Sequence, residues 1–337
     1  MKSADLVTLI EELAQTYGPT GREAPVRDLV RRAVEGRADE MHVSHVGSLH
    51  ALVNKGGGRR MMLTAHMDEI GVIVSHIDTH GYARFHPMGG VDMDTCVGHR
   101  VRFATGAMAV IGVEKRKDRS KSPTIEQLFL DFGAGGPADC PVAVGDIGAF
   151  DRPFLRLGQR VVSKALDDRV GVAVLIETIR RLDRTPHEVQ FVFTVQEEFT
   201  SAGGKTSAFA LEPEVALAVD VANTGDTPRG PKIAAALGKG PMIKVRDSGM
   251  VSDPRLVDLL ARRASAAKIP HQFEVVEGIT TDGADIQVSR SGVVAAGISI
   301  PCRYIHTPSE MVDLGDVENV VRLLLEVLRQ PLDLHQP

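Results

Sequence analysis

Histidine and carboxylate residues directly follow apolar, strand-like segments at five places in this 337-residue chain. These residues are His66 and Asp68, Asp167 and Asp168, Glu197 and Glu198, Asp220, and His306. Ligand sites of α/β proteins are built where the strands end. We therefore expect these side chains to converge at one edge of a sheet. Each of them taken singly is a weak signal, because lone histidines and Asp-Asp pairs at helix starts are common in ordinary folds.

Two histidines with three carboxylates and no cysteine form the ligand set of a pair of divalent ions such as Zn²⁺, Co²⁺ or Mn²⁺. If one carboxylate bridges, each ion has a histidine, a terminal carboxylate, the shared carboxylate and a shared water. Such a pair, about 3.5–4 Å apart, lowers the pKa of the water and polarises a carbonyl group. One of Glu197 and Glu198 can bind metal while the other moves protons. The spacing leaves open which glutamate does so, and whether Asp167 or Asp168 is the ligand.

The chain divides into three regions with different sequence patterns. Residues 1 to about 68 predict two helices, around Leu6–Leu13 and Glu23–Val34, and then strands. From about 71 to 162, short alternating runs punctuated by glycine predict a small β barrel or sandwich. After 162, helical and strand-like segments alternate again, which is typical of a sheet flanked by helices. The simplest interpretation is an α/β domain interrupted by a β insertion.

Composition and charge exclude several classes of protein. The net charge of −5 argues against nucleic-acid binding through a basic surface. No stretch of 18 uncharged apolar residues exists, so we expect no membrane span. The three cysteines lie at 96, 140 and 302 without a CxxC motif, which argues against a disulfide framework or a thiolate zinc site. We expect a cytoplasmic protein.

Seven motifs, in order along the chain, resemble the M42 family of metallo-aminopeptidases, which includes tetrahedral aminopeptidases and glutamyl aminopeptidase-like proteins. They are TAHMDEIG (64–71), SKALDDRVG (163–171), VQEEFTSAGG (195–204), VDVANTGDTP (219–228), ALGKGPMI (236–243), TDGADIQVSRSG (281–292) and IPCRYIHTPSEMV (300–312). The resemblance runs from about residue 5 to 330. Departures lie at GGVDMDTCVGHRV (89–101) and EKRKDRSKS (114–122), which leave the motifs of the metal site untouched.

The resemblance implies a role for each candidate residue. The two metal sites that it implies are His66, Asp167 and Asp220, and Asp167, Glu198 and His306, with Asp167 bridging. Glu197 would be the general base, and Asp68 would orient the His66 imidazole. The implied fold is a mixed sheet flanked by helices with an inserted small β-barrel domain. Residues 1–70 and 160–337 would form the catalytic domain, and 71–159 a barrel-like dimerisation domain.

The expected function is removal of N-terminal residues from peptides with a free N-terminus. Two divalent ions per subunit would bridge the attacking water, with Zn²⁺ favoured and Co²⁺ or Mn²⁺ as alternatives. The resemblance also implies self-association, as a dimer or a tetrahedral dodecamer. Three other functions stay open: a metal-dependent deacylase or carboxypeptidase with the same site, a binding or scaffold protein that keeps the fold, and a glycoside hydrolase. The last is disfavoured because the chain has no Trp for a sugar-binding cleft.

Overall fold

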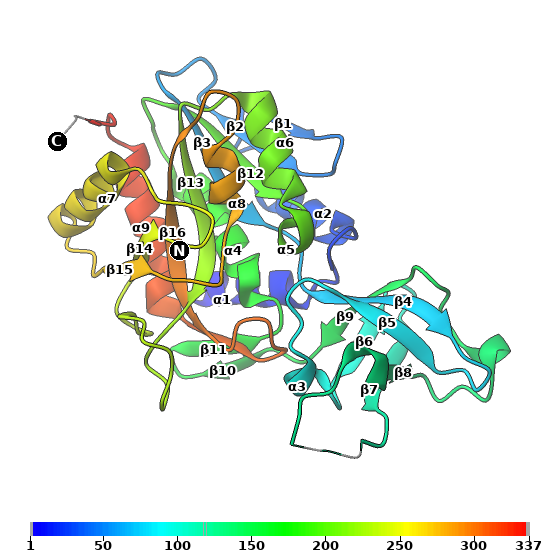
Figure 1. Cartoon of the computed structure of the whole chain (residues 1–337). Helices are drawn as coiled ribbons and strands as arrows, with labels where there is room; N and C mark the ends of the chain where they lie inside the picture. Colours follow the sequence, from blue (N-terminus) through cyan, green and yellow to red (C-terminus); the bar gives the residue numbers. More distant parts are fainter. Residues whose placement is uncertain (1–2, 117, 119, 335–337) are drawn as a thin grey trace.

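The computed structural model describes residues 3–116, 118 and 120–334. Within this part of the chain, the strands form two separate structures, an 11-stranded mixed sheet and a closed barrel (Figure 1). The helices are α1 (Ser3–Gln15), α2 (Ala24–Ala33), α3 (Met93–Cys96), α4 (Leu166–Arg181), α5 (Glu197–Thr200), α6 (Ala202–Leu211), α7 (Pro254–Ala266), α8 (Asp282–Gln287) and α9 (Leu314–Leu328). The prediction of an α/β fold with an inserted small barrel is confirmed.

The centre of the large sheet consists of four parallel strands in the order β12–β3–β13–β16. Their bounds are β12 (Glu188–Thr194), β3 (Arg60–His66), β13 (Val215–Asn223) and β16 (Val294–Arg303). Their residues are buried almost without interruption, which is typical of parallel strands covered on both faces. Parallel strands place their carboxyl ends at the same edge of the sheet. This edge is where the candidate residues begin.

Further strands, most of them paired antiparallel to a neighbour, extend the sheet on both sides of this centre. They are β1 (Glu40–Val43), β2 (Leu49–Val53), β17 (Glu310–Asp313), β11 (Arg160–Ser163), β10 (Leu155–Leu157), β14 (Met242–Arg246) and β15 (Gln272–Val275). β15 pairs in parallel with β14, which pairs with β16. The sequence pattern did not predict β14, because Lys244 and Arg246 break its apolar run. Lys244 is nevertheless fully buried, where its ammonium lies 2.6 Å from the Glu274 carboxylate.

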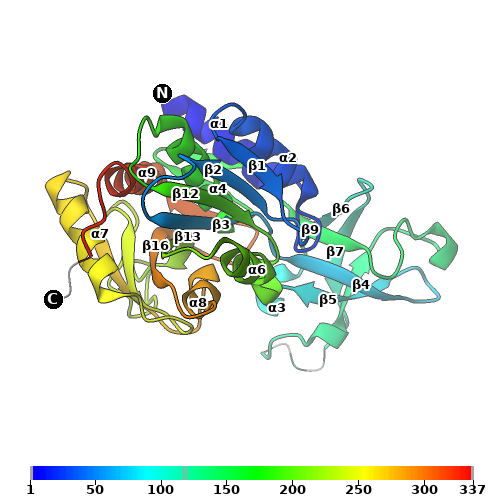
Figure 2. The same cartoon turned by 90° about the horizontal axis from the view of Figure 1, so that it is seen from above.

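Helices cover both faces of the large sheet (Figure 2). Successive side chains of β3 point to opposite faces of the sheet. Met61 and Leu63 belong to the core under α1, α4 and α9, whereas Met62 belongs to a smaller core with residues of α6 and α8. The core on the α4 side is the larger one, and helix α4 crosses it with all of its residues from 166 to 179 buried. The first turn of α4 holds Asp167 at the same edge as the strand ends.

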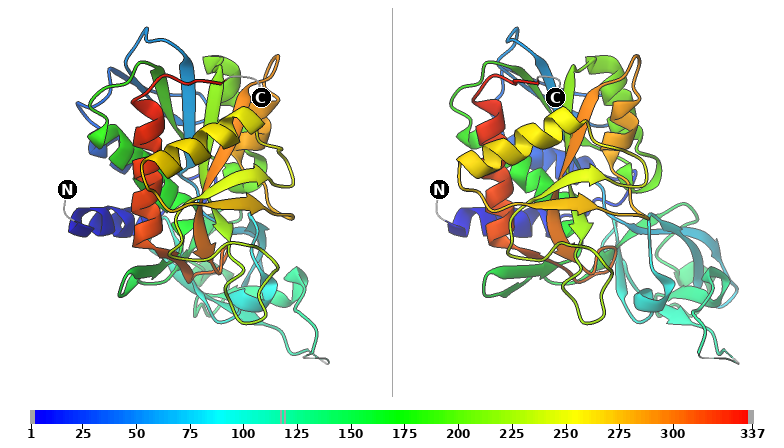
Figure 3. Two further views of the ribbon diagram at one scale, coloured as in Figure 1. Left: turned by 90° about the vertical axis from the view of Figure 1, so that its left-hand side faces the viewer. Right: turned by 60° about the vertical axis from the view of Figure 1, so that its left-hand side comes forward.

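The closed barrel lies to one side of the sheet (Figures 1 and 3). Its strands, in their order around it, are β4 (Gly71–Ile77), β5 (Ala83–Met88), β8 (Leu128–Asp131), β7 (Met108–Val113), β6 (Arg100–Phe103) and β9 (Ile147–Asp151). It has a core of its own, which includes Phe85 and Phe150. The chain enters at β4 and leaves at β9, which pair with each other. Strands β10 and β11 follow and belong to the large sheet rather than to the barrel.

The two segments whose sequences depart from the M42 pattern, residues 89–101 and 114–122, belong to the barrel. Within residues 89–101, the short helix α3 lies between strands β5 and β6. Part of residues 114–122 lies outside the described residues, at 117 and 119. Among the described helices, none is long and apolar enough to cross a membrane.

Candidate metal centre

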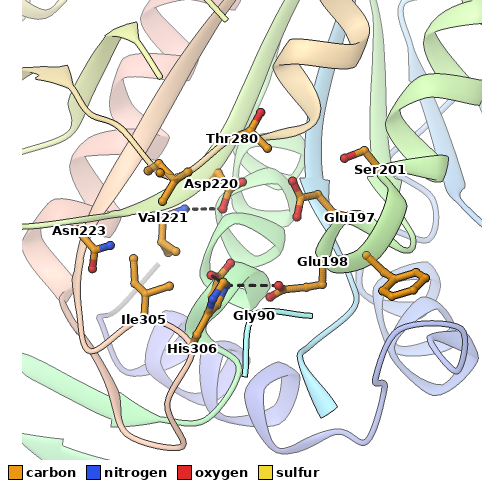
Figure 4. Close-up of a pocket in the computed structure, with 14 residues that line it drawn as sticks. Gly90, Glu197, Glu198, Ser201, Asp220, Val221, Asn223, Thr280, Ile305 and His306 are labelled. Atoms are coloured by element: carbon orange, nitrogen blue, oxygen red, sulfur yellow. Dashed lines mark hydrogen bonds and ion pairs between the residues drawn. The ribbon is translucent and has the colours of Figure 1, made fainter. Parts of the chain in front are cut away.

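The predicted site residues meet around one cavity of about 560 Å³ at the carboxyl edge of the parallel strands (Figure 4). His66 is the last residue of β3, Asp220 lies near the end of β13, and His306 follows β16 by three residues. Glu197 and Glu198 begin α5 directly after β12. The sheet register therefore positions residues that are up to 240 positions apart in the sequence.

Asp167 lies between the two histidines. Its Oδ1 is 3.0 Å from His66 Nε2 and its Oδ2 is 3.4 Å from His306 Nε2. Glu198 Oε2 lies 3.3 Å from His306 Nε2, and Asp220 Oδ1 lies 3.9 Å from His66 Nε2. Ligand atoms bonded at about 2.0–2.2 Å to one tetrahedral ion lie about 3.3–3.6 Å apart. The observed spacings are close to that range on both sides of Asp167.

The cluster has more buried negative charge than positive charge. Burial, and then the charge of Asp167, raise the pKa of Asp220 well above its usual range and raise the pKa of Glu198 as well. Glu198 Oε1 is buried without a hydrogen-bond partner among the described residues. Because a carboxylate oxygen needs a donor or a cation when it is buried, this donor set fits divalent cations.

The two glutamates of α5 point in different directions (Figure 4). Glu198 faces His306, whereas Glu197 lies toward Asp220 and has its Oε2 4.0 Å from His66 Nε2. Burial raises the pKa of Glu197 well above its usual range; the His66 charge opposes the shift and the Asp220 charge adds to it. Burial therefore places Glu197 in an environment that favours its protonated form.

Asp168 occupies a different position from Asp167. Its Oδ2 accepts a hydrogen bond from the His66 N–H at 3.3 Å and its Oδ1 accepts one from the Gly171 N–H at 3.1 Å. The second bond is typical of an aspartate that caps the start of a helix. Ligand atoms of His66, Asp168 and Asp220 lie within 4.8 Å of one another, as do those of His66, Asp167 and Glu198. Both oxygens of Asp168 already accept backbone hydrogen bonds.

Asp68 joins two of the strand ends. Its Oδ1 lies 3.5 Å from His66 Nδ1 and accepts the Glu197 N–H at 3.0 Å, and its Oδ2 accepts the Glu198 N–H at 3.2 Å. Burial opposes its charge, but the hydrogen bond with His66 and further donors outweigh burial and lower the pKa of Asp68. A single ionised carboxylate thus holds both the histidine and the turn that carries the two glutamates.

Glu310 was not among the predicted site residues and has a comparable role. Its Oε2 accepts the Asp167 N–H and its Oε1 accepts the His306 N–H, both at 2.9 Å. It is the first residue of β17 and is buried, at 2% exposed. The available signal was the motif at 300–312, which contains Glu310 four residues after His306.

Arg169 fixes the start of α4 through hydrogen bonds to neighbouring backbone segments and through an ion pair. It is fully buried and donates to the backbone oxygens of Met67 at 2.6 Å and Gly18 at 3.1 Å. Its guanidinium also lies 3.4 Å from Glu69, which accepts a 2.6 Å hydrogen bond from buried Lys164. These contacts fix the backbone of residues 164–169 against β3 and the N-terminal segment, so the Asp167 carboxylate is positioned by charges that are not themselves ligands.

Comparison with known proteins gives consistent matches over nearly the whole chain. The sequence model described as M42 glutamyl aminopeptidase matches residues 47–323. The lysyl aminopeptidase of Pyrococcus furiosus is 34% identical over 96% of this chain and 98% of its own. The aminopeptidase APDkam598 from the archaeon Desulfurococcus kamchatkensis superposes with a TM-score of 0.93 at 37% identity, covering 98% of this chain and 96% of its own. The dodecameric PhTET1-12s structure superposes with a TM-score of 0.88 at 29% identity, covering 96% of this chain and 99% of its own.

Replacing Arg169 by methionine should destabilise the fold strongly. The Arg169→Met variant removes one of the two buried cations beside Glu69, which keeps Lys164, and leaves several buried backbone oxygens without their donor. Each buried polar group left unsatisfied costs about 1–3 kcal/mol. The measurement is the midpoint of urea unfolding followed by circular dichroism, in chelator. The control, Arg31→Met, changes an exposed arginine of α2 and should shift stability by less than about 0.5 kcal/mol. Equal midpoints for the two variants would contradict the anchoring role.

Proposed function

We propose a mechanism on the premise that this chain belongs to the M42 glutamyl aminopeptidase family and hydrolyses peptide bonds. It removes N-terminal residues from peptides by means of five metal ligands and one carboxylate that is not a ligand. The observation that carries the proposal is the divergence of Glu197 and Glu198, since one faces His306 and the other faces the cavity (Figure 4). Adjacent residues thereby divide metal binding and proton transfer.

M42 aminopeptidases depend on metal ions, and five side chains here would hold two of them. The proposed sites are His66, Asp167 and Asp220 for one ion, and Asp167, Glu198 and His306 for the other. The two oxygens of Asp167 support this division, because each lies within 3.4 Å of a different histidine. Two divalent ions bound there lower the pKa of a water molecule and polarise the scissile carbonyl. Nitrogen and oxygen donors suit Zn²⁺, with Co²⁺ and Mn²⁺ as alternatives.

Glu197 is the proposed general base. It accepts a proton from the attacking water as the water oxygen bonds to the carbonyl carbon, and it returns this proton to the leaving amine as the C–N bond breaks. The raised pKa of Glu197, caused mainly by burial, suits a group that must both take and give a proton. Asp68 is a positioning residue, since it holds the Glu197 backbone and His66 at once.

The lining of the cavity bears on the alternatives. A carboxypeptidase needs a cationic side chain for the C-terminal carboxylate of its substrate. Among the described residues that line the cavity, none is Lys or Arg. A glycoside hydrolase typically binds sugars on aromatic faces. Phe199 is the one aromatic residue in the same lining, and it lies beside the glutamates. Both features support an aminopeptidase.

The proposal includes self-association in the cytoplasm. The PhTET1-12s structure is a dodecamer, and the present chain superposes on its subunit over 96% of its length, barrel included. We assign subunit pairing to the barrel segment, residues 71–159, which has its own core and lies to one side of the sheet. Dimers formed in this way would be the units of a larger shell.

Metal ions should stabilise the protein through Asp167. Binding neutralises buried carboxylates in the folded state only, and a ligand at a hundredfold excess over its Kd adds about 2.7 kcal/mol of stability per site. The measurement is the thermal midpoint of chelator-treated protein with and without added Zn²⁺, together with metal content by mass spectrometry. Asp167→Asn should lose most of the midpoint increase and both ions. Retention of two ions by this variant would contradict the bridging role, whereas Glu11→Gln on exposed α1 should behave as wild type.

Removing the proposed base should separate metal binding from turnover. Glu197→Gln keeps the size of the side chain but cannot accept the proton, so kcat should fall by about 10²–10⁴-fold, the usual contribution of general acid–base catalysis. The measurement is hydrolysis of leucine p-nitroanilide beside metal content. Glu198→Gln is the matched comparison, because it should lose one ion as well as activity. Turnover within a few-fold of wild type in Glu197→Gln would overturn the assignment.

A further inference from the structure

The cavity has two walls of different chemistry (Figure 4). One wall carries Glu197, Glu198, Phe199 and Ser201, all from the segment after β12. The opposite wall carries Val221 and Asn223 of β13 and Ile305 after β16. Ile279 also lines the cavity and packs against Ala222, Ala235 and Met242, which places it on the β13 side.

The position of Glu197 decides which wall receives the N-terminal side chain. This step rests on the proposed function, in which Glu197 returns a proton to the leaving amine. The leaving amine belongs to the second residue of the substrate, so that residue lies on the Glu197 wall beside Phe199 and Ser201. The N-terminal residue is on the other side of the scissile bond, and its side chain therefore extends toward Val221, Ile279 and Ile305.

Apart from Asp220 and His306, which are proposed metal ligands, this second wall offers no charged group to a substrate. Its other side chains are aliphatic except for the neutral amide of Asn223 and the hydroxyl of Thr280. Asp226, three residues after Asn223, and Arg303, two residues before Ile305, are hydrogen-bonded to each other through two contacts of 3.0 and 2.6 Å. Glu277, next to the lining residue Gly278, lies 3.2 Å from Arg246. A lysine or glutamate side chain of a substrate would therefore lose water on this wall without gaining a partner.

We infer that this chain selects uncharged, apolar N-terminal residues, and that the wall of Val221, Asn223, Ile279 and Ile305 makes the selection. Family membership does not decide this point, because one relative is named for lysine and the family for glutamate. An apolar side chain gains from contact with three aliphatic residues, and a charged one is rejected because it has no counter-ion. A difference of at least about tenfold is expected for such a site.

The first test is a substrate profile of the metal-loaded wild-type protein. We expect kcat/KM for the p-nitroanilides of leucine and methionine to exceed those of lysine and glutamate at least tenfold. Equal or higher values for lysine or glutamate would overturn the inference and leave the proposed function standing. Cleavage of none of these substrates, nor of leucyl peptides, with Zn²⁺, Co²⁺ or Mn²⁺ would instead overturn the proposed function.

The second test changes the charge of the wall. Asn223→Asp keeps the shape of the side chain and adds the counter-ion that lysine lacks, so the lysine-to-leucine ratio of kcat/KM should rise at least tenfold. Val288→Asp, at an exposed apolar residue outside the cavity, makes the same kind of change and should leave the ratio as in wild type. An unchanged ratio in Asn223→Asp, with metal content and leucine turnover intact, would contradict the assignment.

The third test distinguishes the two walls. Ile279→Ala should reduce discrimination between leucine and alanine p-nitroanilides several-fold, because fewer aliphatic atoms contact the substrate. Phe199→Ala should leave that discrimination unchanged and should alter the preference for the second residue in a series of leucyl dipeptides. The reverse pattern would show that the N-terminal side chain lies on the Glu197 wall and would overturn the inference.

Discussion

Crowded carboxylates at the end of a parallel sheet are the constraint on which this structure depends. Asp167, Glu197, Glu198 and Asp220 line one cavity with His306, and His66 lies 3.0 Å from Asp167. Three of the four carboxyl groups have pKa values raised by burial and by their neighbours. Such a cluster opposes folding unless positive charge joins it. The donor set fits divalent cations, so the same feature that opposes folding of the metal-free chain suits cation binding.

The surrounding residues hold the carboxylates in place without becoming ligands. Asp68 and Glu310 each accept two backbone N–H groups from segments that carry candidate ligands. Arg169 and Lys164 bring two buried positive charges against Glu69 below the start of α4. The carboxylates that face the cavity are therefore supported by carboxylates that bind backbone, and the two buried cations pair separately with Glu69. Preorganisation of this kind fixes ligand geometry before any ion binds.

The sequence predicted the class of fold and the convergence of the candidate residues because both follow from local patterns. Apolar strands that end in His66 or in Glu197 are visible in the sequence, and parallel strands must end at one edge. The choice between Asp167 and Asp168 was not accessible in this way, since it depends on which carboxylate oxygens accept backbone hydrogen bonds. Glu310 was missed because a carboxylate that caps two backbone segments has no periodic signal.

Strand β14 was also not predictable from local sequence patterns, because Lys244 is buried there by its ion pair with Glu274 rather than by hydrophobicity.

The barrel is a third part of the structure that the sequence pattern predicted incompletely. Its loop at residues 89–101 departs from the family pattern, and from the sequence alone this departure bears on both subunit contacts and the substrate pocket. In the structure, Gly90 lines the cavity, and a Cβ at this position would collide with the His306 imidazole. A Cβ at Gly89 would lie 3.2 Å from Glu198 Oε2, and its φ of +88° is a conformation that favours glycine. The barrel segment therefore reaches the cavity at Gly90 and contacts Glu198 at Gly89, so side chains at these two positions would alter the candidate site itself.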